Sequence, residues 1–198
     1  MNTDVNRPLW LLFRWLLRTL LRPFYFARGF RVLGASRLPK LCCPLILAAN
    51  HADFIDSVYF MLAVRPRFTI CGGKPRLFRN GAMRALMALA NVLKVDGHQQ
   101  YLHDCCNLLL RGEILLIYPE MGRFPNAMGE FKTWAAEVAL ASGVPILPCY
   151  LYGTTRGQAG APRLYVGRPL KPRGDAVELT VELRQAIEAL APSTGAAS

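Results

Sequence analysis

Residues 44–56 read PLILAANHADFID, and the apolar run in them ends at Asn50, directly before a histidine. A short run of Leu, Ile and Ala between a proline and polar residues is typical of a buried strand. In open α/β sheets, ligands bind at the carboxyl ends of such strands. The segment therefore predicts a strand over 44–49 that places His51 where reactive groups usually lie.

The rest of the chain repeats this alternation of short apolar runs with stretches of helical periodicity. Extended segments are expected over residues 29–33, 44–49, 68–71, 92–95, 113–118, 145–151 and 163–166. Helices are expected over residues 55–64, 80–90, 99–111, 130–142 and 176–190. This order predicts an α/β single-domain sandwich, in which helices flank a mostly parallel central sheet.

The size and composition of the chain fit one such domain. It has 198 residues, of which 53% are hydrophobic and 19% are charged. We expect residues 29–191 to form the domain and residues 192–198 to be a flexible tail. The six cysteines include no C-x-x-C spacing, which favours reduced, mostly buried thiols in a cytosolic environment. The cluster from His98 to Cys106 is poorly spaced for a metal site, and no metal is expected.

The N-terminal segment combines apolar residues with regularly spaced arginines. Residues 8–26 read PLWLLFRWLLRTLLRPFYF, and the longest uncharged run is far shorter than the ~18 residues of a spanning helix. On a helix, one stripe of about 80° contains Arg7, Arg14, Arg18 and Arg22. We expect residues 1–28 to form an amphipathic helix in a membrane interface, with these arginines among anionic headgroups. The alternative is a helix packed on the domain, with its arginines in water.

The net charge of +11 arises entirely in the first half of the chain. Residues 1–100 contain 15 Lys and Arg against 4 Asp and Glu, whereas residues 101–198 contain 9 of each kind. This asymmetry indicates an anionic partner, which could be a phospholipid surface, a nucleic acid or a phosphorylated substrate. Nucleic acid is the least favoured, because the arginine stripe shares its helix with Trp and Leu and no recognition motif is visible.

His51 and Asp56 have the spacing of a catalytic base and its partner. A turn after the strand can bring the Asp56 carboxylate to one nitrogen of the His51 imidazole, which fixes the tautomer and leaves the other nitrogen as a base. Such a base removes the proton of a hydroxyl nucleophile, with a typical gain of ~10²–10⁴ in rate. The alternative is a hydrogen-bonded structural histidine at a strand end.

A second polar loop, YPEMGR, follows the strand over 113–118 and is expected at the same edge of the sheet. Arg123 has a planar fork suited to phosphate, and Glu120 can orient it or accept a hydroxyl proton; the alternative is a salt bridge between the two. A further basic cluster consists of Lys74, Arg76, Arg79 and Arg84. It could hold phosphates of the donor or acceptor, or an acidic carrier protein, or be solubilising charge alone.

The order of these segments resembles the 1-acylglycerol-3-phosphate acyltransferase family over roughly residues 30–170. The match consists, in chain order, of Asn50-His51 with Asp56, Lys74, Pro119-Glu120, Gly122-Arg123, Phe131-Lys132 and Val144-Pro145-Ile146-Leu147-Pro148. The resemblance implies acyl transfer from acyl-CoA or acyl carrier protein to a hydroxyl of a lysophospholipid, with His51 as base, Asp56 as its partner and no cofactor. The substrate-binding residues it implies are Asn50, Lys74, Glu120, Gly122, Arg123 and Lys132. It also implies a peripheral protein at the cytoplasmic face of the cell membrane, held by the N-terminal helix.

Three departures from the family pattern affect the parts that bind the acceptor. Met121-Gly122 replaces the usual Gly-Thr, Gly97 stands where an arginine is usual, and Trp134 replaces a glycine. The His-Asp pair is retained, so acyl transfer is expected while the acceptor is altered. The alternatives are an O-acyltransferase for another lipid alcohol, such as an aminolipid or a glycolipid intermediate, or a weakened relative that binds lipid without catalysis.

Overall fold

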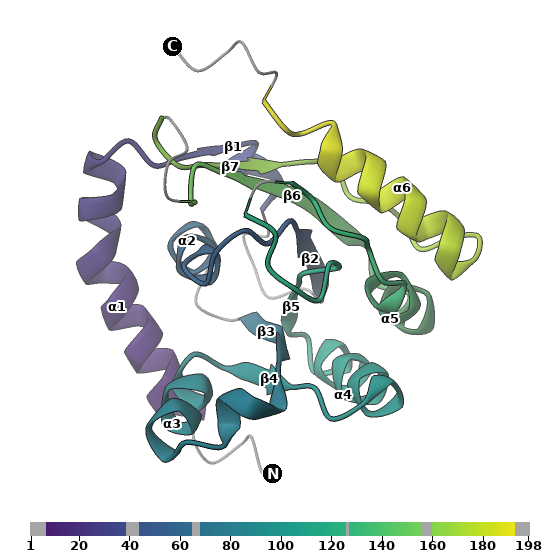
Figure 1. The fold of residues 1–198 in the computed structure, drawn as a ribbon, viewed down its shortest axis with the longest axis horizontal. Helices are drawn as coiled ribbons and strands as arrows, with labels where there is room; N and C mark the ends of the chain where they lie inside the picture. Colours follow the sequence, from purple (N-terminus) through teal and green to yellow (C-terminus); the bar gives the residue numbers. More distant parts are fainter. Residues whose placement is uncertain (1–6, 39–43, 65–67, 126, 156–159, 193–198) are drawn as a thin grey trace.

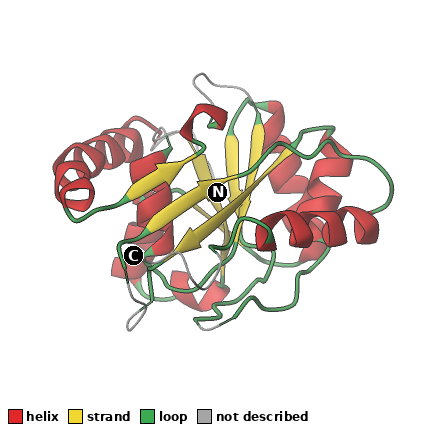
Figure 2. Cartoon of the chain, turned by 90° about the horizontal axis from the view of Figure 1, so that it is seen from above, coloured by secondary structure: helices red, strands yellow, loops and turns green. Residues whose placement is uncertain are grey.

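The computed structural model describes residues 7–38, 44–64, 68–125, 127–155 and 160–192, and these form three layers. Seven strands make one sheet in the order β1-β7-β6-β2-β5-β3-β4. Helices α1 and α2 cover one face of the sheet, and α4, α5 and α6 cover the other (Figure 1). Seen from above, helices lie on both sides of the strands (Figure 2).

The elements have the following bounds. The strands are β1 (Arg31–Leu33), β2 (Leu45–Ala49), β3 (Phe68–Gly73), β4 (Val92–Lys94), β5 (Ile114–Ile117), β6 (Ile146–Tyr152) and β7 (Arg163–Val166). The α-helices are α1 (Arg7–Ala27), α2 (Asp56–Ala63), α3 (Gly81–Leu89), α4 (His98–Leu110), α5 (Trp134–Ser142) and α6 (Ala176–Glu188). Two short 3₁₀ helices are η1 (Ala35–Arg37) and η2 (Pro75–Phe78).

The centre of the sheet is apolar on both sides, as a parallel sheet covered by helices requires. Every residue of β2 and β5 is buried, and β2 pairs in parallel with both β5 and β6. In the described chain, β6 and β7 form the single antiparallel pair among neighbouring strands. The predicted fold class, a mostly parallel sheet flanked by helices, is confirmed.

Local sequence signals explain where several helices begin and end. The side chain of Asn80 accepts hydrogen bonds from the first turn of α3, and Asp175 does the same for α6 within a capping box. Helix α5 ends at Gly143, whose φ of 69° suits a glycine. The helix predicted over 130–142 begins only at Trp134, because the preceding residues are tied to the end of β5 by the Lys132 N–H bond to the Pro119 carbonyl.

Helix α1 presents a different face to the domain from the one predicted. Arg14 is only 1% exposed, and its guanidinium lies 3.9 Å from the centre of the Phe68 ring and donates to the Phe68 carbonyl. Leu17 and Leu21 follow on this inward face and pack on the core. The prediction that Arg14 lies among headgroups is therefore wrong, and the side chain of Arg7 is outside the described part of the chain. The exposed face of the helix is apolar and includes Leu9, Leu12, Trp15, Leu16, Leu20 and Phe24.

Some predictions cannot be compared with the structure. Cys42, Cys43 and residues 193–198 of the predicted tail lie outside the described residues. Among the cysteines that are described, Cys71, Cys105 and Cys149 are buried free thiols and Cys106 is partly buried. Within the described residues, no helix is both long enough and apolar enough to cross a membrane.

Candidate active site

The candidate site lies where β2 and β5 end side by side. Ala48 of β2 is in register with Ile117 of β5, so the residues that follow each strand emerge at the same edge of the sheet. His51 comes from the first of these loops and Tyr118 from the second. This is the edge at which parallel α/β sheets bind ligands.

His51 and Asp56 form the predicted pair. The Nδ1 atom of His51 lies 2.9 Å from Oδ2 of Asp56, whose side chain is 1% exposed, whereas that of His51 is 17% exposed. The same Oδ2 accepts the backbone N–H groups of Ala52 at 2.8 Å and Asp53 at 2.9 Å. Three donors therefore fix the carboxylate, and the carboxylate orients the imidazole so that Nε2 is left for chemistry.

Both backbone polar groups of His51 are held by the loop that follows β5. Its N–H donates to Oε1 of Glu120 at 2.8 Å, and its carbonyl accepts from the N–H of Phe124 at 2.8 Å. The other oxygen of Glu120 accepts the Gly129 N–H at 2.6 Å. Burial raises the pKa of Glu120, and these two backbone hydrogen bonds act in the opposite direction. Glu120 thus ties together the loops that follow β2 and β5.

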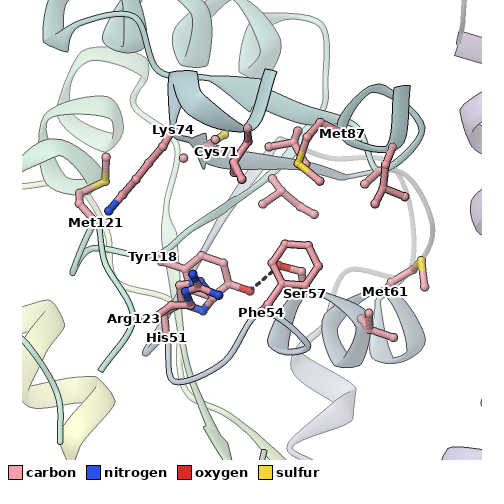
Figure 3. Close-up of a pocket in the computed structure, with 18 of the residues that line it drawn as sticks. His51, Phe54, Ser57, Met61, Cys71, Lys74, Met87, Tyr118, Met121 and Arg123 are labelled. Carbon is pink, nitrogen blue, oxygen red and sulfur yellow. Dashed lines mark hydrogen bonds between the residues drawn. The ribbon is translucent and has the colours of Figure 1, made fainter. Parts of the chain in front are cut away.

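Tyr118 supports the imidazole from beneath. The rings of His51 and Tyr118 are stacked, with centroids 3.9 Å apart and planes 13° apart. The phenol oxygen lies 3.0 Å from the Ser57 hydroxyl (Figure 3). Burial raises the pKa of Tyr118, so the phenol stays neutral near neutral pH. Sequence reasoning did not identify this residue; its position at the end of a buried strand in the second loop was the available signal.

A cavity of about 260 Å³ opens beside His51. Its cationic lining includes Lys74, Arg76 and Arg123, and in Figure 3 Arg123 lies close to His51 while Lys74 points toward Met121. Its apolar walls include Phe13, Leu17, Phe54, Val58, Met61, Leu86, Met87 and Val92. The cavity thus joins a positively charged region to an apolar chamber between α1, α2 and α3.

Arg14 marks the part of this cavity that is distant from His51. It lines the cavity and donates a hydrogen bond to the carbonyl of Phe68, the first residue of β3. Phe68 is in register with Ile114, four residues before Tyr118, which corresponds to roughly 13 Å along the strands. Burial lowers the pKa of Arg14 to about 9, against the opposing effect of Glu113. An arginine therefore lies at the amino-terminal level of the strands, and the imidazole at their carboxyl ends.

Of the eight predicted catalytic and substrate-binding positions, four line the cavity, one supports His51 from behind, and three have side chains that do not line the cavity. His51, Lys74, Gly122 and Arg123 line the cavity, and Asp56 lies behind His51. The positions that do not line it are Asn50, Glu120 and Lys132.

Each of those three positions has another set of contacts. The Asn50 side chain accepts from the Leu151 N–H and donates to the Leu151 carbonyl, which ties β2 to β6. Glu120 holds the two backbone amides described above, and Lys132 is an exposed cation 3.3 Å from Glu130. Their side chains are therefore placed to build the loops around the cavity rather than to face its interior.

The predicted cluster on α4 also has local partners. His98 Nε2 lies 2.6 Å from Glu137 on α5, and the His98 ring packs on Trp134. Within the described residues, no three or more His, Cys, Asp or Glu side chains are grouped as metal ligands would be.

Comparison with known proteins places this site in a family. A family model described as Acyltransferase matches residues 29–152, which is more than half of the chain and includes the loops that follow β2 and β5. The chain belongs to the Acyltransferase family. Together with the relatives and the solved structure described next, this match confirms the predicted resemblance to the 1-acylglycerol-3-phosphate acyltransferases.

Curated members of this family are similar to the chain over part of their length. A chloroplastic 1-acyl-sn-glycerol-3-phosphate acyltransferase of Arabidopsis thaliana is 29% identical over 67% of this chain and 37% of its own. One of Chlamydomonas reinhardtii is 27% identical over 86% of this chain and 54% of its own. This acyltransferase chain therefore spans about half of these relatives or less.

A solved structure of the family has the same fold. The 1-acyl-sn-glycerophosphate acyltransferase PlsC of Thermotoga maritima superposes with a TM-score of 0.73, covering 91% of this chain and 78% of its own. Sequence identity is 20%, so the similarity concerns the arrangement of the sheet and helices.

Proposed function

We propose that this acyltransferase moves a fatty acyl group from acyl-CoA or acyl carrier protein to the hydroxyl of 1-acylglycerol-3-phosphate or a related lysophospholipid. The observation that carries the proposal is the position of His51, which is held by Asp56 and lines an apolar cavity together with Arg123 and Lys74. The names of the curated relatives support the same class of reaction.

In the proposed reaction, His51 acts as the general base. Asp56 accepts a hydrogen bond from the Nδ1–H group, so Nε2 of the neutral imidazole is free to take the proton of the acceptor hydroxyl. The hydroxyl oxygen attacks the thioester carbonyl carbon, a C–O bond forms, and the C–S bond of the resulting tetrahedral intermediate breaks. The thiolate then leaves with the proton from the imidazolium. The products are an ester and a free thiol, and the base is regenerated.

The remaining lining of the cavity suits the other parts of the two substrates. Arg123 and Lys74 offer a planar fork and a point charge for the phosphate of the acceptor or donor. The aliphatic and aromatic walls suit the acyl chain, because burying apolar surface is favourable by about 25 cal/mol per Å². Apolar walls next to the imidazole also disfavour water and so limit hydrolysis of the thioester.

The exposed face of α1 supports a reaction at a membrane surface. Leu16 and Leu20 project outward, while Leu17 on the other side of the same helix lines the cavity. A helix with such an outer face, next to exposed Arg22 and Arg28, suits the interface of an anionic membrane. We place the protein at the cytoplasmic face of the cell membrane, where its buried thiols would remain reduced.

A second candidate acceptor is a lipid alcohol without the phosphatidate headgroup. Met121 has a φ of 50° and lines the cavity, and in Figure 3 its side chain lies beside the Lys74 amine. Its bulk takes up space next to a cation that a phosphate would have to approach. An aminolipid or glycolipid hydroxyl would depend less on that contact.

The test is acyl transfer by the purified chain with labelled acyl-CoA or acyl carrier protein and a panel of acceptors. We expect His51→Ala to lower turnover by about 100-fold or more while binding to vesicles is retained. His103→Ala is the matched control, because His103 is exposed on α4 and its ring contacts Asn107. Equal activity of the two variants would exclude His51 as the base. Vesicle binding without transfer to any acceptor would favour a non-catalytic lipid-binding relative.

A further inference from the structure

A chain of hydrogen bonds connects helix α6 to the backbone of His51. Arg184 Nη1 donates to the Gly129 carbonyl at 2.7 Å, and the Gly129 N–H donates to Glu120 Oε2 at 2.6 Å. The other oxygen of Glu120 accepts the His51 N–H at 2.8 Å. Helix α6 (Ala176–Glu188) lies beyond residues 29–152, the part of the chain that matches the family.

The guanidinium of Arg184 is held in place for this role. Its Nε donates to Glu188 at 2.8 Å, one turn further along α6, and its central carbon lies 5.3 Å from the centre of the Phe131 ring. A planar guanidinium that is fixed at two points directs its remaining N–H groups. Nη1 is thereby directed at the loop that follows β5.

Gly129 is the point at which this contact reaches the catalytic loop. A Cβ added to Gly129 would lie 2.4 Å from the Phe124 ring, so the loop packs against that ring without room for a side chain. The N–H of Phe124 in turn donates to the His51 carbonyl. Gly129 is therefore connected to His51 along two routes, through Glu120 and through Phe124.

We propose that Arg184 is a positioning residue, which holds the loop of Gly129 and Glu120 against His51 and so fixes the imidazole for proton transfer. The proposal rests on the proposed function of His51 as base. A base must lie within ~2.6–3.2 Å of the proton donor, and a misplacement of about 1 Å can cost ~10²-fold in rate. The Arg184 charge also opposes the effect of burial on Glu120 and favours its ionised, doubly accepting form.

Two measurements on the full chain test this role, hydrogen exchange of backbone amides and steady-state kinetics. In Arg184→Met, we expect the His51 and Gly129 amides to exchange at least about tenfold faster, while amides in β2 and β5 keep their rates. We expect kcat to fall about tenfold with the KM for the acyl donor unchanged. Arg184→Lys retains a donor and a charge, so it should recover part of both effects.

Arg173→Met is the matched control, because it also removes an arginine paired with a glutamate of α6, the exposed Arg173–Glu182 pair, and leaves the Arg184 contacts in place. We expect it to behave as the wild type. Unchanged exchange at His51 and Gly129 in Arg184→Met would overturn the proposal, and so would equally faster exchange throughout the sheet, which indicates general destabilisation. The exchange result does not depend on turnover. An inactive wild type with the expected exchange pattern would thus contradict the proposed function and not the hydrogen-bonded connection.

Discussion

The imidazole of His51 lies flat on the ring of Tyr118, with the ring planes 13° apart. Asp56 holds the imidazole through one nitrogen. A single hydrogen bond still allows the ring to rotate about the line that joins Nδ1 to Oδ2. The Tyr118 ring removes that freedom, because tilting the imidazole would break the stacked contact. The imidazole, our proposed base, is thus oriented by a carboxylate at its edge and an aromatic ring at its face.

Two replacements of Tyr118 distinguish the effect of its stacking on His51 from the effect of its hydrogen bond with Ser57. Both Tyr118→Phe and Tyr118→Leu lose the hydroxyl group that contacts Ser57. Only Tyr118→Leu also loses the aromatic ring that stacks on His51. An aromatic pair is worth ~0.5–1.5 kcal/mol, so we expect kcat of the Leu variant to fall up to about tenfold below that of the Phe variant. Steady-state kinetics of both variants, with thermal unfolding as a check on folding, measure this. Equal kcat values would show that the ring does not hold the imidazole.

The outer face of α1 should determine binding to anionic vesicles. Leu16 and Leu20 are exposed, Leu20 at 73%, and each fully buried Leu contributes ~1.5–3 kcal/mol. We expect Leu16→Glu with Leu20→Glu to weaken binding in vesicle sedimentation by at least about tenfold. Val181→Glu is the control, because Val181 is 50% exposed on α6, on the other face of the sheet (Figure 1). Similar losses in the control and the double variant would indicate charge repulsion alone.

Met121 provides a test of the acceptor. A non-glycine residue at a φ of 50° carries a cost of ~1–2 kcal/mol, and glycine relieves it at an entropic cost of ~0.5–1 kcal/mol. We therefore expect Met121→Gly to raise the free energy of unfolding by up to about 1 kcal/mol, measured by urea denaturation. Removing the side chain also opens the approach to Lys74, so the ratio of activity on lysophosphatidate to activity on a phosphate-free acceptor should rise.

Met121→Ala separates the two effects of the glycine. It removes most of the side chain from the cavity while the backbone remains in the left-handed region. We expect it to shift the acceptor ratio in the same direction without the gain in stability. An unchanged ratio in both variants would mean that Met121 does not limit the approach of the acceptor phosphate.

The buried strands could be predicted from sequence, and so could the pair at their edge. LILAA and ILLI are short apolar runs bounded by polar or turn residues, and that pattern has few alternatives to a covered parallel sheet. His51 and Asp56 are five residues apart, so one turn decides their contact. Contacts within such a short segment are encoded locally.

The contacts that could not be predicted are those between distant segments. Glu120 reaches the backbone of His51 across 69 positions, and Arg14 reaches Phe68 across 54. Helical spacing does place Arg14 on one face with Leu17 and Leu21, but hydrophobicity assigns an arginine to solvent unless its partner is known. Polar side chains that face inward depend on a partner from another element, and that partner is visible only in the fold.

Arg14 should set the length of acyl chain that the cavity accepts. Its guanidinium lies at the end of the apolar chamber remote from His51, and an acyl chain that reached it would press methylene groups against a buried cation. Arg14→Met replaces the cation with an apolar side chain. We expect the preferred acyl chain to lengthen, with kcat/KM rising about fourfold for each additional methylene that becomes buried, from ~0.8 kcal/mol each.

A series of acyl donors of increasing length, compared at equal concentrations, measures this shift. Arg14→Lys is the control, because it retains a cation at the same place and should keep the wild-type optimum. Arg14→Met also removes one of two side-chain donors to the Phe68 carbonyl, which keeps its bond from Asn91, so the fold is verified by circular dichroism before kinetics. If the folded Met variant keeps the wild-type optimum, the acyl chain does not extend toward Arg14, and the chamber between α1 and α3 must hold another part of the substrates.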